Sequence, residues 1–368
     1  MSDFLDLNKK YITAKKFLKD QILQCEIKPG QKIPSEHELA QQLNVSRHTI
    51  RRAISELVAE GYLITEHGKG TYCRIIQSTR SNTKIIGVIT TYISEYIFPR
   101  VIEGIERVLS EKGYGMILKN TLNDPEKESQ YLQEMFDKNV EGLIIEPTKS
   151  SLVPKNLSYF KAFENRRVPY VFIHGWYEKM EDKPMVIVDD EKGMFEAVDY
   201  LAKKGKRKIA GIFKVDDIQG INRHKGYVKA LMNNGIAYDP DLVVWFHSED
   251  KYLKCSYGVQ KLFGSSQKPD SVACYNDEIA VWVIKELNDM NLAVPQDVSV
   301  TGFDDSFLAS SAVANLTTIK HPKDLLGEHA ARMVLELINE QDPVENGSAK
   351  DISTKVIFKP EIVIRGTA

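Results

Sequence analysis

Between residues 33 and 57 the chain reads Ile33-Pro-Ser-Glu-His-Glu-Leu-Ala-Gln-Gln-Leu-Asn-Val-Ser-Arg-His-Thr-Ile-Arg-Arg-Ala-Ile-Ser-Glu-Leu57. Ser35 and Glu38 have the spacing of a capping box, in which each side chain accepts from the other residue's backbone N–H, so a helix is predicted to begin here. A turn follows at residues 44–45, and Ser46 can cap a second helix by accepting a free backbone N–H. The stretch therefore predicts two short helices joined by a tight turn.

The second of these helices has two different faces. Its apolar side chains recur at the spacing of one buried stripe, Ile50, Ala53, Ile54 and Leu57. Arg47 and Arg51 are four residues apart, so they project together from another face, and Arg47 lies in the first turn, where helix-turn-helix proteins touch base edges. Solvated surface arginines are the simpler interpretation of such a pair. The cap, the turn and the arginine spacing agree, however, and together they indicate DNA binding.

A β-hairpin is predicted directly after the second helix. Residues 62–65 and 71–75 are rich in β-branched and aromatic side chains, as strands are. The tip between them, Glu66-His-Gly-Lys-Gly70, carries two potential cations, His67 and Lys69. We interpret the hairpin as a wing that can lie in or along the minor groove; an ordinary turn is the alternative. A phosphate-binding P-loop is not indicated, because the required spacing of its glycines and lysine is missing.

From residue 85 onward the pattern changes to short apolar strands that alternate with amphipathic helices. Alternation of this kind predicts an α/β fold with parallel, doubly wound sheets. A first series of strands is predicted at 85–90, 114–118, 140–145 and 168–173, with helices near 101–109 and 131–136. A second series is predicted to begin near Val186 and to continue at 208–213, 242–246, 271–275 and 298–302. Two such series predict two sheets, and therefore two lobes, in this part of the chain.

Polar and aromatic side chains follow many of these strands. Ligands of open α/β sheets bind beyond the carboxyl ends of the strands, so two facing sheets would form a cleft that these side chains line. A sugar offers hydroxyl groups to polar side chains and an apolar ring face to aromatic ones. The predicted ligand-binding residues are Tyr92, Tyr96, Glu146, His174, Trp176, Lys214, Arg223, Asn276 and Asp304. Individually, Asn276 could merely cap the next helix, and Tyr92 or Trp176 could belong to the core.

Length and charge set the outer bounds. A chain of 368 residues is too long for one ordinary domain. We expect a DNA-binding head at residues 1–75, a polar linker at 76–84 and a ligand-binding and dimerisation body at 85–368. Residues 1–80 contain 13 Lys and Arg against 9 Asp and Glu, a balance of +4, which leaves −6 for the rest of a chain whose net charge is −2. A basic head on an acidic body suits contact with nucleic acid through the head alone.

The four cysteines, at positions 25, 73, 255 and 274, are scattered without a C-x-x-C pair, so neither a metal site nor a disulfide framework is predicted. Cys25 and Cys73 are expected to be buried small hydrophobic residues. The N-terminus lacks a basic region followed by an apolar run, and no stretch approaches the length of a membrane span, so a cytoplasmic protein is expected. No cofactor is expected.

Residues 8–75 resemble the winged helix-turn-helix of the GntR family. The matching motifs are Lys28-Pro-Gly-Gln-Lys-Ile-Pro-Ser-Glu36, Leu39-Ala, Val45-Ser-Arg, Thr49-Ile-Arg-Arg-Ala and His67-Gly-Lys-Gly-Thr71. The DNA contacts that the resemblance implies are bases for Arg47 and Arg51, phosphates for Ser35, Thr49 and Arg52, the minor groove for His67 and Gly68, and further contacts for Glu36, His48 and Lys69.

Residues 85–368 resemble the effector domain of the LacI/GalR family, which is similar to periplasmic sugar-binding proteins. The motifs that carry the resemblance are Arg223-His-Lys-Gly-Tyr227, Tyr275-Asn-Asp-Glu-Ile-Ala280, Val294-Pro-Gln-Asp-Val-Ser-Val-Thr-Gly-Phe-Asp-Asp305 and Leu316-Thr-Thr-Ile-Lys320. The resemblance implies that Arg223, Asn276 and Asp304 bind the sugar. The position after Lys320 often holds Gln in the family; here it is His321, a further candidate ligand residue whose role stays open.

The same resemblance implies a homodimer formed by both lobes, and a chain that crosses between the lobes three times. The third crossing is expected near His321, where the chain would return to the first lobe. The last helix, near residues 323–339, should therefore pack on the first lobe.

A GntR-type head on a LacI/GalR-type body resembles the arabinose-responsive repressors, and this resemblance covers essentially the whole chain. It implies L-arabinose as the effector, repression of arabinose- and arabinan-utilisation genes, and a palindromic operator read by a homodimer. Residue chemistry alone leaves another pentose or a hexose open. A periplasmic binding protein is disfavoured by the DNA-binding module and by the missing export signal. An enzyme that uses Glu146, His174 and Asp304 as acids and bases is the more distant alternative, since no catalytic motif is present.

Overall fold

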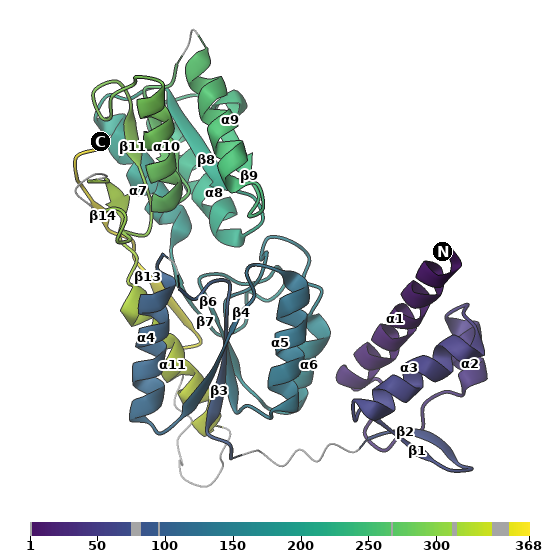
Figure 1. Ribbon diagram of the computed structural model, residues 1–368. Coiled ribbons are helices and arrows are strands. Elements are labelled where there is room, and N and C mark those ends of the chain that lie inside the picture. The colour runs from purple at the N-terminus through teal and green to yellow at the C-terminus, as the bar shows by residue number, and fades with distance from the viewer. Residues whose placement is uncertain (1, 75–81, 95, 266–267, 311–314, 341–352) are drawn as a thin grey trace. The chain divides into compact units, whose positions relative to one another are not determined.

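The computed structural model describes residues 2–74, 82–94, 96–265, 268–310, 315–340 and 353–368, and Figure 1 shows the chain as a ribbon. Two compact units are distinguished by their internal contacts. The first consists of residues 1–82, 132–139 and 156–168, and the second consists of residues 83–131, 140–155 and 169–368. Most of the predicted linker, residues 76–84, lies outside the described residues.

The N-terminal part of the first unit contains the predicted helix-turn-helix. Its elements are α1 (Ser2–Leu23), α2 (Glu36–Gln42), α3 (Arg47–Ala59), β1 (Leu63–Glu66) and β2 (Gly70–Cys73). Ser35 and Glu38 form the predicted capping box, and Ser46 caps α3 by accepting the Thr49 N–H. The predicted apolar stripe of α3 is buried, and α1, which the motifs did not indicate, packs against α3.

The predicted hairpin is present and is anchored from one side. Strands β1 and β2 pair antiparallel, from Leu63 opposite Cys73 to Glu66 opposite Gly70. The segment before α2 runs along the other edge of β2, where the Cys73 N–H donates to the Gln31 carbonyl at 2.8 Å. The tip of the hairpin is exposed. The hairpin therefore projects from a fixed base, as a wing requires.

The two cysteines of the head differ in their environment. Cys73 is buried at the end of β2, as predicted. Cys25 is exposed, so the prediction that it is buried is wrong. It lies just beyond α1 in left-handed backbone (φ 57°), and its N–H donates to the Ile22 carbonyl at 3.1 Å. Its Sγ accepts a hydrogen bond from the Asn165 Nδ2 at 3.2 Å in this exposed position.

Both large sheets of the second unit are parallel throughout, as the α/β pattern predicts. The first sheet has the order β13-β7-β6-β5-β3-β4 and the second has the order β11-β10-β8-β9. The first contains β3 (Ile85–Thr90), β4 (Gly115–Asn120), β5 (Gly142–Ile145), β6 (Tyr170–Ile173), β7 (Met185–Val188) and β13 (Lys355–Phe358). The second contains β8 (Ile209–Lys214), β9 (Val243–Phe246), β10 (Ser271–Cys274) and β11 (Ser299–Thr301).

Two predictions about the path of the chain are corrected. Strand β7 does not open the second lobe, because it pairs with β6 and β13 in the first sheet. The connection from β6 to β7 contains no helix, so an alternation of strands and helices could not assign this strand. The crossing near His321 is the second rather than the third. The third follows β13 and leads to the ribbon of β12 (Thr318–Ile319) and β14 (Ile362–Val363).

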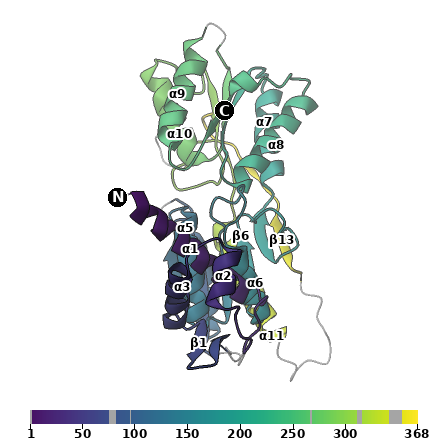
Figure 2. The same ribbon diagram turned by 90° about the vertical axis from the view of Figure 1, so that its right-hand side faces the viewer.

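Helices flank the two large sheets of the second unit. Helices α7 (Asp190–Lys203) and α8 (Ile218–Asn233) pack together beside the second sheet, as do α9 (Lys251–Gly264) and α10 (Asp277–Asp289), and Figure 2 shows the two pairs on opposite sides. The remaining helices are α4 (Phe98–Glu111), α5 (Pro125–Asp137), α6 (Leu157–Asn165), α11 (Lys323–Glu340) and the short η1 (Pro240–Leu242). None of the described helices is long and apolar enough to cross a membrane.

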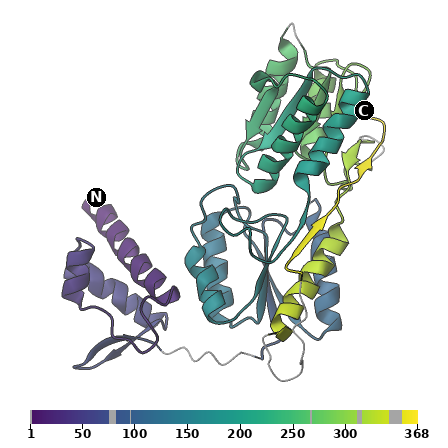
Figure 3. The same cartoon turned by 180° about the vertical axis from the view of Figure 1, so that it is seen from behind.

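Helix α11 packs on the first lobe, as predicted, and lies beside α4 (Figure 3). The two helices approach each other to backbone contact at two glycines. A Cβ on Gly327 would lie 2.1 Å from the Val101 carbonyl oxygen, and one on Gly104 would lie 2.4 Å from the Asp324 carbonyl oxygen. Only a residue without a side chain fits at these positions. The return of the chain to the first lobe is thus fixed by a close helix crossing.

Gly327→Ala is expected to lower the free energy of unfolding by about 1–3 kcal/mol, because the added methyl group collides with backbone that cannot move independently. Urea unfolding of the full chain measures this. Gly264→Ala, at the end of α9, is the matched control, since nothing lies within 4 Å of its added Cβ. Equal stabilities of the two variants would contradict the close crossing.

Candidate functional site

The exposed face of α3 presents the arginines that the sequence analysis assigned to base contacts. The Arg51 guanidinium is held by Glu36, with Nε 3.0 Å from Oε1 and Nη2 2.7 Å from Oε2. This hydrogen-bonded pair lowers the pKa of Glu36. Arg47 Nη2 lies 2.9 Å from His37 Nδ1. Both arginines are therefore oriented by residues of α2 while they stay open to solvent.

The predicted phosphate contacts have different environments. Ser35 is exposed, and its hydroxyl accepts the Glu38 N–H as part of the capping box. Thr49 is buried, and its hydroxyl lies 2.8 Å from the Ser46 hydroxyl. The Arg52 guanidinium lies 3.9 Å from the centre of the Tyr11 ring. Their roles as phosphate ligands stay predictions.

At the wing tip, His67, Gly68 and Lys69 are all exposed, as is His48 on α3. Gly68 has a φ of 76°, in the left-handed region that favours glycine, and nothing lies within 4 Å of the position of a Cβ. The Lys69 ammonium lies 3.2 Å from Glu66, its neighbour across the turn. The tip can therefore approach another surface closely without reorganising the head.

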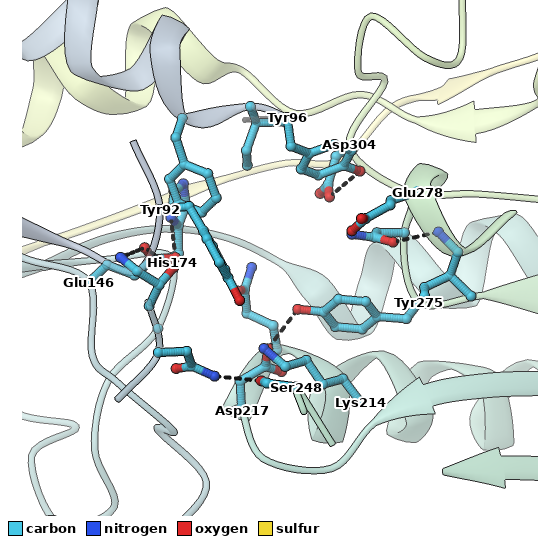
Figure 4. Close-up of a pocket in the computed structure, with 18 of the residues that line it drawn as sticks. Tyr92, Tyr96, Glu146, His174, Lys214, Asp217, Ser248, Tyr275, Glu278 and Asp304 are labelled. Carbon is cyan, nitrogen blue, oxygen red and sulfur yellow. Dashed lines mark hydrogen bonds and ion pairs between the residues drawn. The ribbon is translucent and has the colours of Figure 1, made fainter. Parts of the chain in front are cut away.

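A cavity of about 230 Å³ lies between the two lobes of the second unit, at the carboxyl ends of their strands (Figure 4). Eight of the ten predicted ligand residues line it: Tyr92, Tyr96, Glu146, His174, Lys214, Arg223, Asn276 and Asp304. Trp176 and His321 are not among the lining residues. Most of the residues that the sequence analysis selected near strand ends therefore lie around one cavity.

Arg223 is the most constrained side chain of the cavity. It is fully buried, and its Nε donates to Asp190 Oδ1 at 2.8 Å, its Nη1 to the Tyr275 carbonyl at 2.7 Å and its Nη2 to Asp304 Oδ1 at 3.2 Å. The guanidinium lies 3.7 Å from the centre of the Phe303 ring. Burial raises the pKa of Asp190 to about 7 even beside this cation. These bonds use three of the five N–H groups of Arg223 and leave two.

Asp304 is shared between the lobes. The hydroxyl of Tyr96, which follows β3 in the first lobe, donates to Asp304 Oδ2 at 2.7 Å and accepts the Asp277 N–H at 3.2 Å. Tyr96 and Asp304 both have positive φ, 62° and 96°. Non-glycine residues in such backbone are strained and occur preferentially at functional sites. One carboxylate of the second lobe is thus held by both lobes.

The opposite wall of the cavity is built around Glu146. Its Oε2 accepts the Thr91 N–H at 2.7 Å and the Thr91 hydroxyl at 2.6 Å, and its Oε1 lies 3.1 Å from His174 Nδ1. The ring of His321 packs behind that of His174, with 5.1 Å between their centres. Burial lowers the pKa of His321. His321 therefore supports His174 from behind the wall.

Two further ion pairs line the cavity. Lys214 Nζ lies 3.1 Å from Asp217 Oδ2, and Lys251 Nζ lies 2.7 Å from Glu278 Oε1. The Asp217 carboxylate also accepts the Tyr275 hydroxyl at 2.6 Å and caps α8 through the Gly220 N–H. Asp217 therefore has a structural task besides its pairing with Lys214.

The charged lining residues that the sequence analysis missed lie at the starts of helices that follow the strands. Lys251 begins α9, Glu278 is the second residue of α10, and Asp217 precedes α8. Extending the search to the cap and the first turn of the helix after each strand would have found them. Asn276, predicted either to cap a helix or to bind ligand, does cap α10 through its oxygen and also lines the cavity. The other missed lining residues are Thr91, Ile97, Phe98, Asn123, Pro147, Ser150, Gly175, Gln219, Phe246, Ser248, Tyr275, Ile279, Phe307 and Leu308.

Known proteins match both parts of the chain. The model of bacterial regulatory proteins of the gntR family matches residues 10–73, and that of the periplasmic binding protein-like domain matches residues 198–368. The arabinose metabolism transcriptional repressor of Geobacillus stearothermophilus is 37% identical over 361 residues, with 97% of each chain covered. The protein of the same name from Halalkalibacterium halodurans is 38% identical over 363 residues, 97% of this chain and 96% of that relative. The crystal structure of transcription regulator CcpA of Lactococcus lactis matches with a TM-score of 0.67 at 26% identity, and covers 77% of this chain and 99% of that one.

Arg223→Met is expected to lower the free energy of unfolding of the second unit by about 3–5 kcal/mol, because it leaves Asp190 and Asp304 buried without their cation. Arg332→Met is the matched control, since Arg332 is an exposed arginine paired with Glu328 on α11. Urea unfolding of both variants measures the difference. A similar small loss in both would show that Arg223 is not the centre of the buried network.

Proposed function

The chain belongs to the family of the arabinose metabolism transcriptional repressors, and from this premise we propose that a sugar held in the cavity, L-arabinose, releases the N-terminal head from operator DNA. The chain is a DNA-binding transcriptional repressor with a winged helix-turn-helix head. The names of its relatives support arabinose as the effector. The shape and chemistry of the cavity support a ligand of this class.

One observation carries the proposal: Asp304 is held by Arg223 from its own lobe and by Tyr96 from the other. A polyol can accept from the two remaining N–H groups of Arg223 and donate to oxygens of the cavity. The rings of Tyr92 and Phe98, which also line the cavity, offer faces for the C–H side of a sugar. A cavity of about 230 Å³ has room for a small ligand such as a monosaccharide. The sugar would thus join the two lobes at Asp304.

The exposed side of α9 is the proposed contact of a homodimer. Leu253 and Tyr257 are 73% and 67% exposed, and the Tyr252 ring packs at a tilt against Trp282 of α10 with 4.6 Å between the ring centres. Apolar side chains gathered on one helix face favour burial against a partner. A second copy docked there would give two heads, which a palindromic operator with two half-sites matches.

The proposed switch is a coupling between two equilibria. A sugar that binds one arrangement of the lobes better than the other shifts the population toward the first. If that arrangement holds the two heads less well on the two half-sites, sugar and operator weaken each other by the same factor, commonly about 5–150-fold. This reciprocity is a thermodynamic requirement and gives the proposal its test.

The arrangement of acids in the cavity supports binding over acid–base catalysis. Both oxygens of Glu146 are engaged by Thr91 and His174, and both oxygens of Asp304 are engaged by Tyr96 and Arg223. A general acid or base must instead reach the reacting proton. The known relatives are transcriptional regulators.

L-Arabinose is expected to raise the melting temperature of the full chain more than other pentoses and hexoses do, because it binds only the folded cavity.

Calorimetric titration with the best sugar, with and without operator DNA, then measures the coupling. We expect affinity to fall in the presence of operator by the factor that the sugar imposes on operator binding. Equal sugar affinity in both titrations would overturn the switch, and a stronger shift by another sugar would overturn L-arabinose.

Arg51→Ala is expected to lower the affinity for operator by about 1–3 kcal/mol and to leave sugar binding intact, because Arg51 lies on α3, outside the cavity. Arg332→Ala, which removes another exposed arginine, is the control. Fluorescence anisotropy with labelled operator and with a scrambled duplex of equal length measures specific binding. The recognition role of α3 would be refuted by an unchanged ratio of the two affinities.

A further inference from the structure

The winged head forms one compact unit with parts of two helices of the ligand-binding body. Besides residues 1–82, the first unit contains residues 132–139, which include the end of α5, and residues 156–168, which include α6. Helix α1 packs against α6, and Lys19 of α1 donates to Gln133 of α5, with 2.7 Å between Nζ and Oε1. The head therefore contacts a surface outside its own fold.

Lys19 lies at the centre of this contact. Its side chain is only 11% exposed, and its ammonium lies 4.5 Å from the centre of the Tyr62 ring in the head and 5.9 Å from that of Tyr159 on α6. The ammonium also donates to Glu60 Oε2 at 3.2 Å. Gln133 Oε1, which accepts from Lys19, accepts the Tyr159 hydroxyl at 3.2 Å as well. A cation beside aromatic rings is stabilised more strongly when it is removed from water. One cation thus joins the head to both helices.

A second contact lies at the end of α1. The Asn165 side chain of α6 donates to the Leu23 carbonyl at 3.3 Å and to Cys25 Sγ at 3.2 Å. Like the contact at Lys19, it consists of polar groups. The Tyr62 hydroxyl is buried and has no hydrogen-bond partner among the described residues, so the packing at Lys19 leaves one polar group unsatisfied. Polar interfaces within one chain permit relative motion of the parts that they join. This contact is therefore suited to open and close.

The residues expected to bind DNA take no part in the contact. Arg47 and Arg51 lie in the first turns of α3, where His37 and Glu36 of α2 orient them, and the wing tip is exposed. Glu60, which binds Lys19, lies at the other end of α3. A docked head can therefore present its recognition helix while its far end is held by α5 and α6.

Both of these helices begin shortly after loops that line the cavity. Asn123 precedes α5 and Ser150 precedes α6, and both residues line the cavity. Asn123 Nδ2 donates to Ser248 Oγ at 2.6 Å, and Ser150 Oγ accepts the Ile218 N–H at 2.9 Å, so both loops contact the second lobe. A ligand that changes the arrangement of the lobes acts on these loops. Helices are rigid enough to carry such a change to their far ends.

We propose that Gln133, Tyr159 and Asn165 form the docking surface of the head, and that docking through Lys19 transmits the effect of the sugar to the operator. The proposal rests on the proposed function, because it names the route of that switch. Two docked heads of a dimer would be held in place for two half-sites at once, which raises the affinity for the whole operator. A sugar that displaces α5 and α6 weakens docking, and each head then binds its half-site alone.

Thiol cross-linking tests the docking directly, because Cys25 is exposed and lies beside Asn165. In the Asn165→Cys variant of the full chain, we expect a short bifunctional maleimide to join the two thiols, and mass spectrometry identifies the linked peptides. The double variant Cys25→Ser with Asn165→Cys is the control for reaction with other thiols. Absence of the linked peptides would overturn the docking surface.

A charge variant shows whether the cross-link depends on docking rather than on tethering alone. Gln133→Lys places a second cation against Lys19, so we expect it to slow the cross-link of Asn165→Cys by about tenfold. Gln130→Lys makes the same change at an exposed residue of α5 and should leave the rate unchanged. Equal rates in the two charge variants would contradict the contact at Lys19.

The cross-linked chain then tests the route of the switch, because its heads cannot leave the docking surface. Fluorescence anisotropy with labelled operator, with and without L-arabinose, measures release. We expect the sugar to release the unlinked Asn165→Cys chain but to change the operator affinity of the linked chain less than about twofold. Calorimetric titration confirms that the linked chain still binds the sugar.

Equal release of the linked and unlinked chains would show that the signal does not pass through docking, and the proposal would be wrong. If no sugar releases even the wild-type chain, the proposed function fails, and with it the route. The cross-link then still decides whether the head docks on α5 and α6.

Discussion

The buried contact between Arg223 and Asp304 is the interaction on which the effector domain depends. Asp304 lies where the chain leaves β11, and Arg223 lies on α8, 81 residues earlier. Tyr96 of the first lobe reaches the same carboxylate. A buried charge needs its partners in place, because each member left alone would be strongly destabilising. The Asp304 carboxylate therefore connects α8 with the end of β11 inside the second lobe, and it also connects this lobe to Tyr96 of the first lobe.

Local signals allowed the two helices of the helix-turn-helix and the hairpin that follows them to be predicted. The capping box of Ser35 and Glu38 and the cap of Ser46 are formed by neighbours in sequence, so their geometry follows from spacing. Sheet membership is not local. Strand β7 has the apolar composition of any buried strand, and only its pairing with β6 and β13 assigns it to the first sheet. For the same reason β13, near the end of the chain, could not be predicted.

The lining residues of the cavity could be predicted from the sequence where the topology of the backbone alone determines their position. Residues at or shortly after the carboxyl ends of parallel strands converge whatever their side chains, and most of the eight candidates that line the cavity lie there, whereas Arg223 lies within α8. His174 and Trp176 show the limit of that rule. Both follow β6, but the backbone at His174 is left-handed (φ 63°), and the turn places His174 and Gly175, but not Trp176, at the cavity. Such a turn depends on packing around the residue rather than on its position after a strand.

The head and the cavity both contain an arginine paired with a carboxylate, but the two pairs differ in their burial. The side chain of Arg51 is 68% exposed, and solvent screens an ion pair in that setting, so phosphates or bases can replace Glu36 as its partner. The side chain of Arg223 is 1% exposed, and no ligand can displace Asp304 from it without leaving a charge stranded. The pair on α3 is therefore suited to being exchanged when DNA binds. The pair in the cavity is suited to staying closed, so that a ligand must fit around it.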